Sequence, residues 1–163
     1  MKSAAVREGS GNVGAAWTPG GWTGRRFHLG NNKEVFAAEV YAIYQELSIM
    51  DQRQETGRRY TIFANFTAAI ERVRSDAIGP GQRFAAAAIE VGTQLTPRNN
   101  EVAIHWVPAH HGVQGNETAD EMARAAGEGN QPDDAVPDEL RWETSLSHMA
   151  RVAAGGCSRT TTE

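Results

Sequence analysis

The sequence reads WVPAHHGVQGNETAD over residues 106–120. The run 101–107, which leads into this stretch, alternates apolar residues with polar or small ones and predicts a strand with one buried face, including Trp106. Asn116 is a favourable N-cap for a helix over residues 117–126. The stretch therefore predicts a strand, a glycine-containing loop and a helix in direct succession.

Outward from this stretch, hydrophobic periodicity and the Gly and Pro breakers predict the other elements. The expected strands are residues 4–10, 12–17, 22–29 and 59–63, and the expected helices are residues 35–50, 67–74 and 83–95. Successive strands imply antiparallel pairing, and strands separated by helices imply parallel pairing. We therefore predict an α/β fold with a mixed five-stranded sheet, in which three antiparallel strands precede two parallel ones and helices cover both faces.

The composition of the chain changes after Gly129. Residues 130–138 contain two prolines and three acids with little apolar content, which is typical of a linker. Residues 140–154 have the pattern of a short helix. The sequence therefore predicts one compact domain over residues 1–128, followed by a linker and C-terminal tail over residues 129–163.

Charge and cysteine content restrict the function. The 163 residues carry a net charge of −4, which argues against tight autonomous binding of nucleic acid but allows a weak binder attached to another domain. The only cysteine is Cys157, which excludes a disulfide framework and a Cys-based zinc site within the chain. Because there is neither a membrane-spanning apolar run nor a secretory signal, we expect an intracellular protein, cytoplasmic or nuclear, without a membrane partner.

Several polar residues fall where α/β proteins build magnesium sites, at strand ends and in adjacent helices. The candidates are Glu8 at the end of the first strand, Glu39 in the first long helix, Asn65 after the fourth strand, Asp120 in the first turn of the last helix, and His110 in the loop before it. A loop histidine can move protons near neutral pH. These positions are far apart in the sequence, so a common site requires the predicted fold.

Each candidate also has a purely structural interpretation. Glu39 has apolar neighbours, among which a charge is costly unless it is paired or holds a metal, but it could equally face solvent on an amphipathic helix. Asp120 in a first helical turn would complement the helix dipole, and His110 could be an ordinary surface residue. Taken one at a time, these residues leave the function open.

The glycine-flanked turn formed by Gly9, Ser10 and Gly11 is a candidate nucleic-acid contact. Its backbone N–H groups could approach a phosphate or sugar, although the tripeptide could also be a plain tight turn. Small arginine clusters, such as Arg25-Arg26, could contact phosphates or lie on a solvated face. Neither feature decides the function alone.

The sequence context of these residues resembles the ribonuclease H domains of retroelement reverse transcriptases, of the fungal non-LTR type. Residues 106–120 resemble the family run W-V-P-x-H-x-G-x-x-G-N-E-x-A-D, and residues 61–70 resemble T-I-F-S-D-S-x-A-A-I. Residues 36–39 resemble the A-E opening of the first helix, and residues 7–11 resemble T-D-G-S-G. The motifs occur in the family order, and the resemblance covers about residues 1–128.

This resemblance implies a ribonuclease-H-like fold and a two-metal-ion endonuclease that hydrolyses the RNA strand of RNA–DNA hybrids. It implies two Mg²⁺ ions, or Mn²⁺, held by Glu8, Glu39 and Asp120, with His110 as the helper histidine and Asn65 at the third acidic position. The implied partners are an RNA–DNA hybrid and a reverse transcriptase domain N-terminal to this one in a parent polyprotein. The 2′-hydroxyl groups would distinguish RNA from DNA.

Three departures from the family pattern fall on the implied site. Asn65 is neutral where the family has an acid, Glu8 is one methylene longer than the usual Asp, and Phe66 replaces a small hydroxyl residue. Because metal affinity depends strongly on site charge, we predict that cleavage is weak or lost. Engineered change, decay and weak residual activity are the open explanations.

Two other functions therefore stay open. The first is a non-catalytic nucleic-acid-binding or scaffold module on the same fold. The second is a protein-interaction domain that no longer binds nucleic acid. A salt-dependent affinity for hybrid would disfavour the second.

Overall fold

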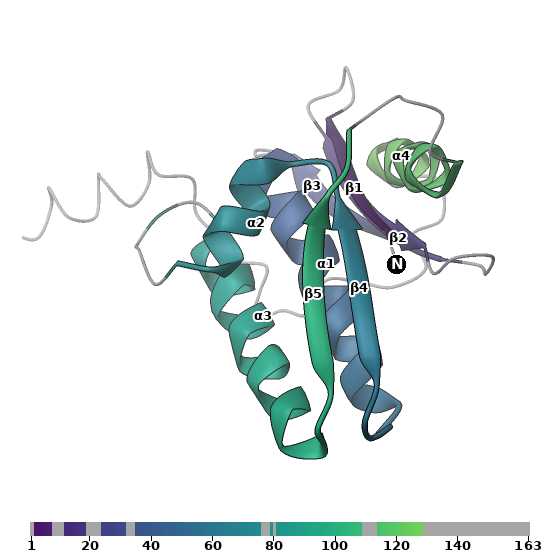
Figure 1. Ribbon diagram of the computed structural model, residues 1–163. Coiled ribbons are helices and arrows are strands. Elements are labelled where there is room, and N and C mark those ends of the chain that lie inside the picture. Colours follow the sequence, from purple (N-terminus) through teal and green to yellow (C-terminus); the bar gives the residue numbers. More distant parts are fainter. Residues whose placement is uncertain are drawn as a thin grey trace, which may run out of the picture.

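The computed structural model describes residues 2–7, 12–18, 24–31, 35–75, 79, 81–108 and 114–128 (Figure 1). Of residues 2–7, 12–14, 17, 18, 31 and 114, only the backbone is described. The predicted linker and tail over residues 129–163 lie outside this part of the chain, so that division stays a prediction. None of the helices among the described residues is long and apolar enough to span a membrane.

Strands and helices occur in the predicted order. The strands are β1 (Lys2–Arg7), β2 (Asn12–Thr18), β3 (Arg25–Asn31), β4 (Arg59–Ala64) and β5 (Glu101–Trp106). The helices are α1 (Val35–Gln52), α2 (Thr67–Val73), α3 (Gln82–Leu95) and α4 (Gln114–Gly127), with a 3-10 turn at Thr96–Arg98. The α/β class is confirmed, and most bounds differ from the predicted ones by one to three residues.

The strands form one sheet in the order β3-β2-β1-β4-β5. Antiparallel pairing joins β1 to β2 and β2 to β3, and parallel pairing joins β1 to β4 and β4 to β5. The parallel register sets Ser3 beside Ala64, the last residue of β4. Four further residues of β1, up to Arg7, therefore extend beyond the end of β4.

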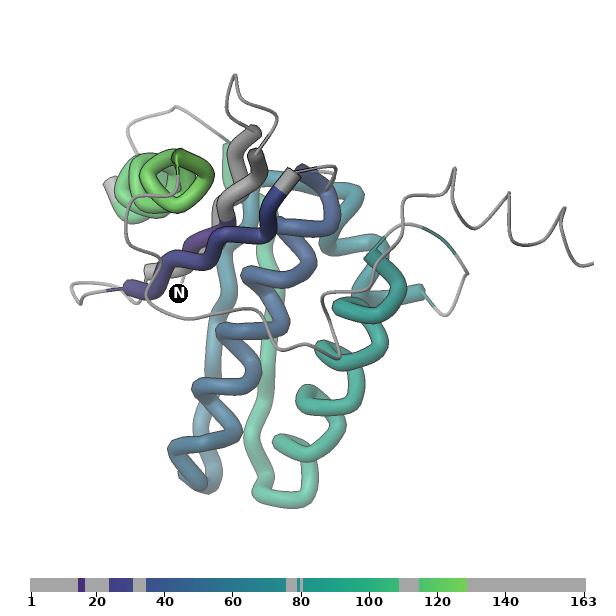
Figure 2. The backbone as a smooth tube through the Cα atoms, turned by 180° about the vertical axis from the view of Figure 1, so that it is seen from behind, coloured from purple at the N-terminus to yellow at the C-terminus, as the bar shows by residue number. Residues whose placement is uncertain are grey.

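Helices cover both faces of this sheet. Neighbouring residues of a strand point to opposite faces, and Ala15 packs with α1 residues whereas Ala16 packs with Ala119 and Ala123 of α4. Hence α1 lies on one face and α4 on the other. Figure 2 shows α1 and α3 side by side, well apart from α4.

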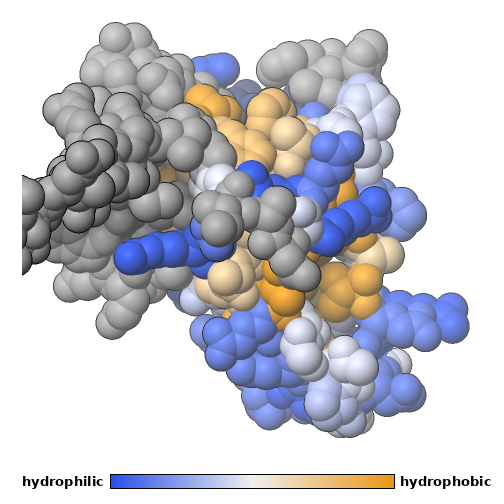
Figure 3. Space-filling model, turned by 90° about the vertical axis from the view of Figure 1, so that its left-hand side faces the viewer, coloured by the Kyte–Doolittle hydropathy of each residue, from blue (hydrophilic) through white to orange (hydrophobic). Residues whose placement is uncertain are grey.

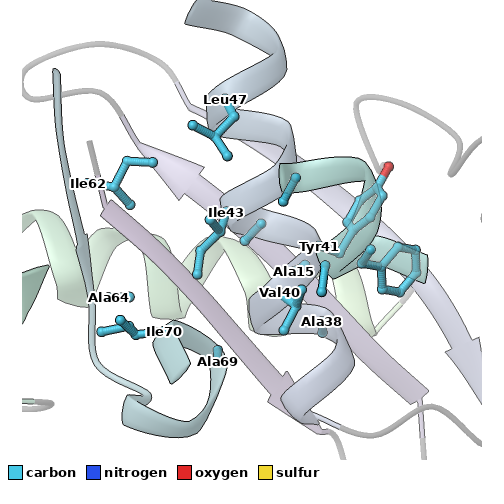
Figure 4. Close-up of a cluster of buried hydrophobic side chains, with 14 of the residues drawn as sticks. Ala15, Ala38, Val40, Tyr41, Ile43, Leu47, Ile62, Ala64, Ala69 and Ile70 are labelled. Carbon is cyan, nitrogen blue, oxygen red and sulfur yellow. The ribbon is translucent and has the colours of Figure 1, made fainter. Parts of the chain in front are cut away.

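The main core lies between the sheet and the α1–α3 layer (Figure 4). Tyr41 of α1 is at its centre, and its ring meets Phe27 of β3 at 5.2 Å and Phe84 of α3 at 5.0 Å between centroids. Both contacts are edge-on, the arrangement that aromatic quadrupoles favour. This packing fixes α1, and with it the position of Glu39, against the sheet.

A buried asparagine joins the starts of the two parallel strands β4 and β5. The Asn100 side chain accepts a hydrogen bond from the Arg58 backbone N–H and donates one to the Glu55 carbonyl, each at 2.8 Å. The backbone N–H of Glu101 also donates to the Arg58 carbonyl at 2.8 Å. These bonds set the register from which β4 runs toward Asn65.

Candidate active site

Glu39 lies in α1 between the buried residues Ala38 and Val40, and it is only 2% exposed. The interpretation that it faces solvent is therefore wrong. Helical periodicity alone could not show whether Glu39 is buried, because α1 carries apolar residues on both of its sides. A buried carboxylate is costly unless hydrogen bonds, an opposite charge or a metal compensate it. Its burial, at a position where the sequence predicts a site acid, makes Glu39 the strongest functional candidate among the described residues.

Asp120 lies in the second turn of α4 and is 8% exposed. The expectation that it occupies a first helical turn is wrong, because α4 begins at Gln114. Glu117 is the acid of the first turn, so it takes the position that complements the helix dipole. Interaction with the helix dipole therefore does not explain why Asp120 is an acid at a buried position.

Asn116 is the described neighbour of Asp120. It lies inside the first turn of α4, so its expected N-cap position is wrong. The i, i+4 spacing lets its Nδ2 donate to Oδ2 of Asp120 at 3.5 Å, the long end of hydrogen-bonding range. Its Oδ1 is buried and has no hydrogen-bond partner in the part of the chain that the structure describes. The Asn116 amide therefore lies next to the Asp120 carboxylate on the buried side of α4.

Asn65 follows the last residue of β4 and is half-buried. The indole Nε1 of Trp106 donates to the Asn65 carbonyl at 3.1 Å, and the Val107 N–H donates to the Ala64 carbonyl at 2.9 Å. Both bonds tie the end of β4 to the end of β5. Trp106 is 55% exposed, so its predicted place on a buried face is wrong. Trp106 is the last residue of β5, after the half-buried Val102 and Ile104, and its indole reaches the end of β4.

The other predicted site residues lie outside the described residues: Glu8, Gly9, Ser10, Gly11 and His110. Their roles stay predictions. The structure does show that β1 ends at Arg7, one residue before Glu8. It also shows that Ser3, and not the last residue of β1, lies beside the end of β4. At the usual rise per residue, Ser3 is about 13 Å along the strand from Arg7.

The described residues include only some of the ligands predicted for a magnesium site. Glu39 and Asp120 offer carboxylate oxygens, the ligands that Mg²⁺ prefers, and both are buried, so the donor type fits this metal. Their helices cover opposite faces of the sheet, and both helices contact β1. Within the described ranges, no group of three His, Cys, Asp or Glu side chains could hold a metal. A complete site therefore needs a ligand from outside these ranges.

Glu46 is a buried acid that the sequence reasoning missed. It lies two helical turns after Glu39, is fully buried, and neither carboxylate oxygen has a hydrogen-bond partner among the described residues. Burial raises the pKa of Glu46 well above its usual value, and the nearby Glu39 charge adds to this effect. The seven-residue spacing, which puts both acids on one side of α1, is the signal that could have identified it.

Comparison with models of protein families shows to which family the chain belongs. The RNase H family model matches residues 3–128. The chain belongs to the RNase H family. No match was found among curated proteins.

Solved RNase H structures share this fold. The N-terminal RNase H domain of Rv2228c from Mycobacterium tuberculosis, determined as a fusion with maltose-binding protein, is 17% identical with a TM-score of 0.59, covering 79% of this chain and 94% of its own. RNase H1 from Halobacterium salinarum is 15% identical with a TM-score of 0.55, covering 78% and 96%. LC11-RNase H1, solved in complex with an RNA/DNA hybrid, is 14% identical with a TM-score of 0.61, covering 78% and 95%. At these identities the likeness establishes the RNase H fold.

Proposed function

We propose that this RNase H domain derives from a retroelement reverse transcriptase of the fungal non-LTR type and acts on RNA–DNA hybrids. The observation that carries the proposal is the burial of Glu39 in α1, at the motif position where the family resemblance expects an acid. The mixed five-stranded sheet provides the frame, because both helices that hold the described acids contact β1. A reverse transcriptase domain N-terminal to this one, and an intracellular location, cytoplasmic or nuclear, belong to the same proposal.

In the proposed site, Glu8, Glu39 and Asp120 would hold two Mg²⁺ ions. Such ions lower the pKa of a bound water and stabilise the leaving oxygen when they are present. Asn116 orients the Asp120 carboxylate through its Nδ2. His110, which precedes α4 in the sequence, would accept or donate a proton, and Gly9, Ser10 and Gly11 would contact the nucleic-acid backbone.

Asn65 is the weak point of this site. A neutral amide offers one carbonyl oxygen and cannot bridge two cations as a carboxylate does. The Asn65 backbone is already held by Trp106, so an acid placed there would enter an organised position. We therefore propose that cleavage is weak or lost in this chain and that restoring the charge restores activity.

The test is a hybrid-cleavage assay in Mg²⁺ and in Mn²⁺ that compares the wild-type chain with Asn65→Asp. We expect the substitution to raise cleavage by at least about tenfold, because it adds a metal ligand and about 1.4 kcal/mol corresponds to a factor of ten. Glu39→Gln in the Asn65→Asp background is the matched control and should abolish the gain. Robust wild-type turnover would contradict the proposed loss.

The second candidate function is a non-catalytic nucleic-acid-binding or scaffold module. The neutral Asn65 favours it, because a binder does not need the full ligand charge. Two results together would distinguish such a module from a nuclease. Hybrid binding would persist unchanged in a chelator, and the Asn65→Asp variant would not cleave the hybrid. Metal-dependent binding or a gain of cleavage would favour the nuclease.

A further inference from the structure

Two phenylalanines and an arginine from separate helical segments form a compact cluster, the Phe36–Phe66–Arg72 cluster. The rings of Phe36 and Phe66 meet edge-on with centroids 6.1 Å apart. The Arg72 guanidinium carbon lies 5.9 Å from the centre of the Phe36 ring, within the range of a cation–π contact. The cluster therefore combines an apolar surface with a positive charge.

Two glycines before α3 leave room for this cluster. A Cβ on Gly81 would lie 3.0 Å from the Phe36 ring, and a Cβ on Gly79 would lie 2.3 Å from the Arg72 guanidinium. Gly81 also has φ of +67°, a conformation that disfavours other residues. The surroundings of Phe36 and Arg72 are thus shaped around their side chains.

The cluster borders the candidate active site. Phe66 directly follows Asn65, and Phe36 lies three residues before Glu39 in α1, which places the two on neighbouring positions of the helix surface. Figure 3 views the side of the molecule on which α2 and α3 lie, where apolar residues gather in the upper and middle parts and hydrophilic residues gather at the lower end. Phe66 and Phe36 are therefore the members of the cluster that lie nearest in the chain to the candidate site residues Asn65 and Glu39.

Phe66 is the exposed member. It is 39% exposed, although its ring has an aromatic partner beneath it. Phe66 and the Arg72 guanidinium both contact the Phe36 ring, so an exposed aromatic ring and a cation belong to one cluster. Such a combination can bind an unpaired nucleotide, because a base stacks on the ring and a phosphate meets the charge. Bases inside a duplex have both faces covered by their neighbours, so such a ring favours an unpaired base.

We propose that Phe66 and Arg72 form a contact for an unpaired nucleotide at the end of a hybrid bound in the candidate site. The base stacks on the Phe66 ring, and the Arg72 guanidinium faces the phosphate. This inference rests on the proposed function, because it needs nucleic acid at that site. It predicts that the domain prefers hybrids with a single-stranded extension over blunt hybrids.

The experiment measures the affinity of the full chain for labelled blunt and overhanging hybrids by fluorescence polarisation. Ca²⁺ replaces Mg²⁺, because it uses the same oxygen ligands with a looser geometry. We expect the overhang to bind about 5- to 10-fold tighter, the lower part of the range for one stacked base. Phe66→Ser should remove this preference, and Phe66→Tyr should retain it.

Ile89→Ser is the matched control, because Ile89 is a large apolar residue of similar exposure, 37%, located on α3. It should leave both affinities unchanged. Arg72→Gln should reduce the salt dependence of binding by about one phosphate contact. Thermal unfolding of each variant verifies that it folds, and equal affinities of the wild-type chain for the two hybrids would refute the proposal even if a variant does not fold.

Three outcomes overturn the inference, and they differ in what they leave of the proposed function. Equal wild-type affinity for blunt and overhanging hybrids, or an overhang preference that survives Phe66→Ser, refutes the stacking contact and leaves the proposed function intact. A lack of binding to every hybrid refutes the proposed function and the inference together.

Discussion

At the scale of single residues, buried acids in α1 are the feature that most needs a physical cause. Glu39 and Glu46 are 2% and 0% exposed in a layer that otherwise consists of alanine, aliphatic and aromatic side chains. Glu39 has a proposed metal to compensate its charge, whereas Glu46 has neither a role nor a hydrogen-bond partner among the described residues. Glu46 therefore lowers stability whenever it is ionised.

Replacing Glu46 should stabilise the domain in a pH-dependent manner. The folded-state pKa of Glu46 is raised above the usual 4.5. The contribution of the protonated Glu46 side chain to the free energy of unfolding is therefore fully present below pH 4.5, and it is lost as the pH rises through the folded-state pKa. Glu46→Met, which keeps the volume, should raise the free energy of unfolding at pH 8 by about 2 kcal/mol and change it little at pH 4.

Urea unfolding at the two pH values measures this difference. Glu90→Met, an exposed acid on α3, is the control and should show no such pH dependence. An equal effect of Glu46→Met at both pH values would contradict the account of Glu46 as a buried group that resists ionisation.

At the scale of elements, sequence patterns predicted the existence and type of each described strand and helix but not all their ends. The start of α4 was placed three residues late, because Asn116 looks like an N-cap while its side chain in fact reaches Asp120. The face of β5 that carries Val102 and Ile104 was predicted correctly, but Trp106 was not, since alternation cannot show what covers the last residue of a strand. Such errors concern tertiary neighbours that local patterns do not contain.

The junction of β4 and β5 offers a test at this scale. Asn100→Ala removes two side-chain hydrogen bonds and leaves the Arg58 N–H and the Glu55 carbonyl without them. We expect the free energy of unfolding to fall by about 2 kcal/mol, the typical cost of unsatisfied buried groups. Thr96→Ala, at an exposed neighbouring position, should change it by less than about 0.5 kcal/mol. Equal effects of the two substitutions in chemical unfolding would show that Asn100 does not join the strands.

At the scale of the whole molecule, the site depends on residues brought together by the sheet. The order of motifs along the chain indicated which residues to consider, and the RNase H fold agrees with that order. The sequence could not show that Glu39 and Asp120 are both buried, because burial depends on how α1 and α4 pack on opposite faces of the sheet. It also could not reveal that Phe36, Phe66 and Arg72 meet, since Phe36 lies far from the other two in the chain.

We propose above all that Glu39 and Asp120 serve one metal centre, although their helices cover opposite faces of the sheet. The most direct test is anomalous X-ray scattering from Mn²⁺-soaked crystals of the wild-type and Asn65→Asp chains. We expect a pair of neighbouring manganese peaks whose ligands include both carboxylates, with higher occupancy in the variant. Manganese bound by only one of the two carboxylates, or by neither, would contradict this proposal.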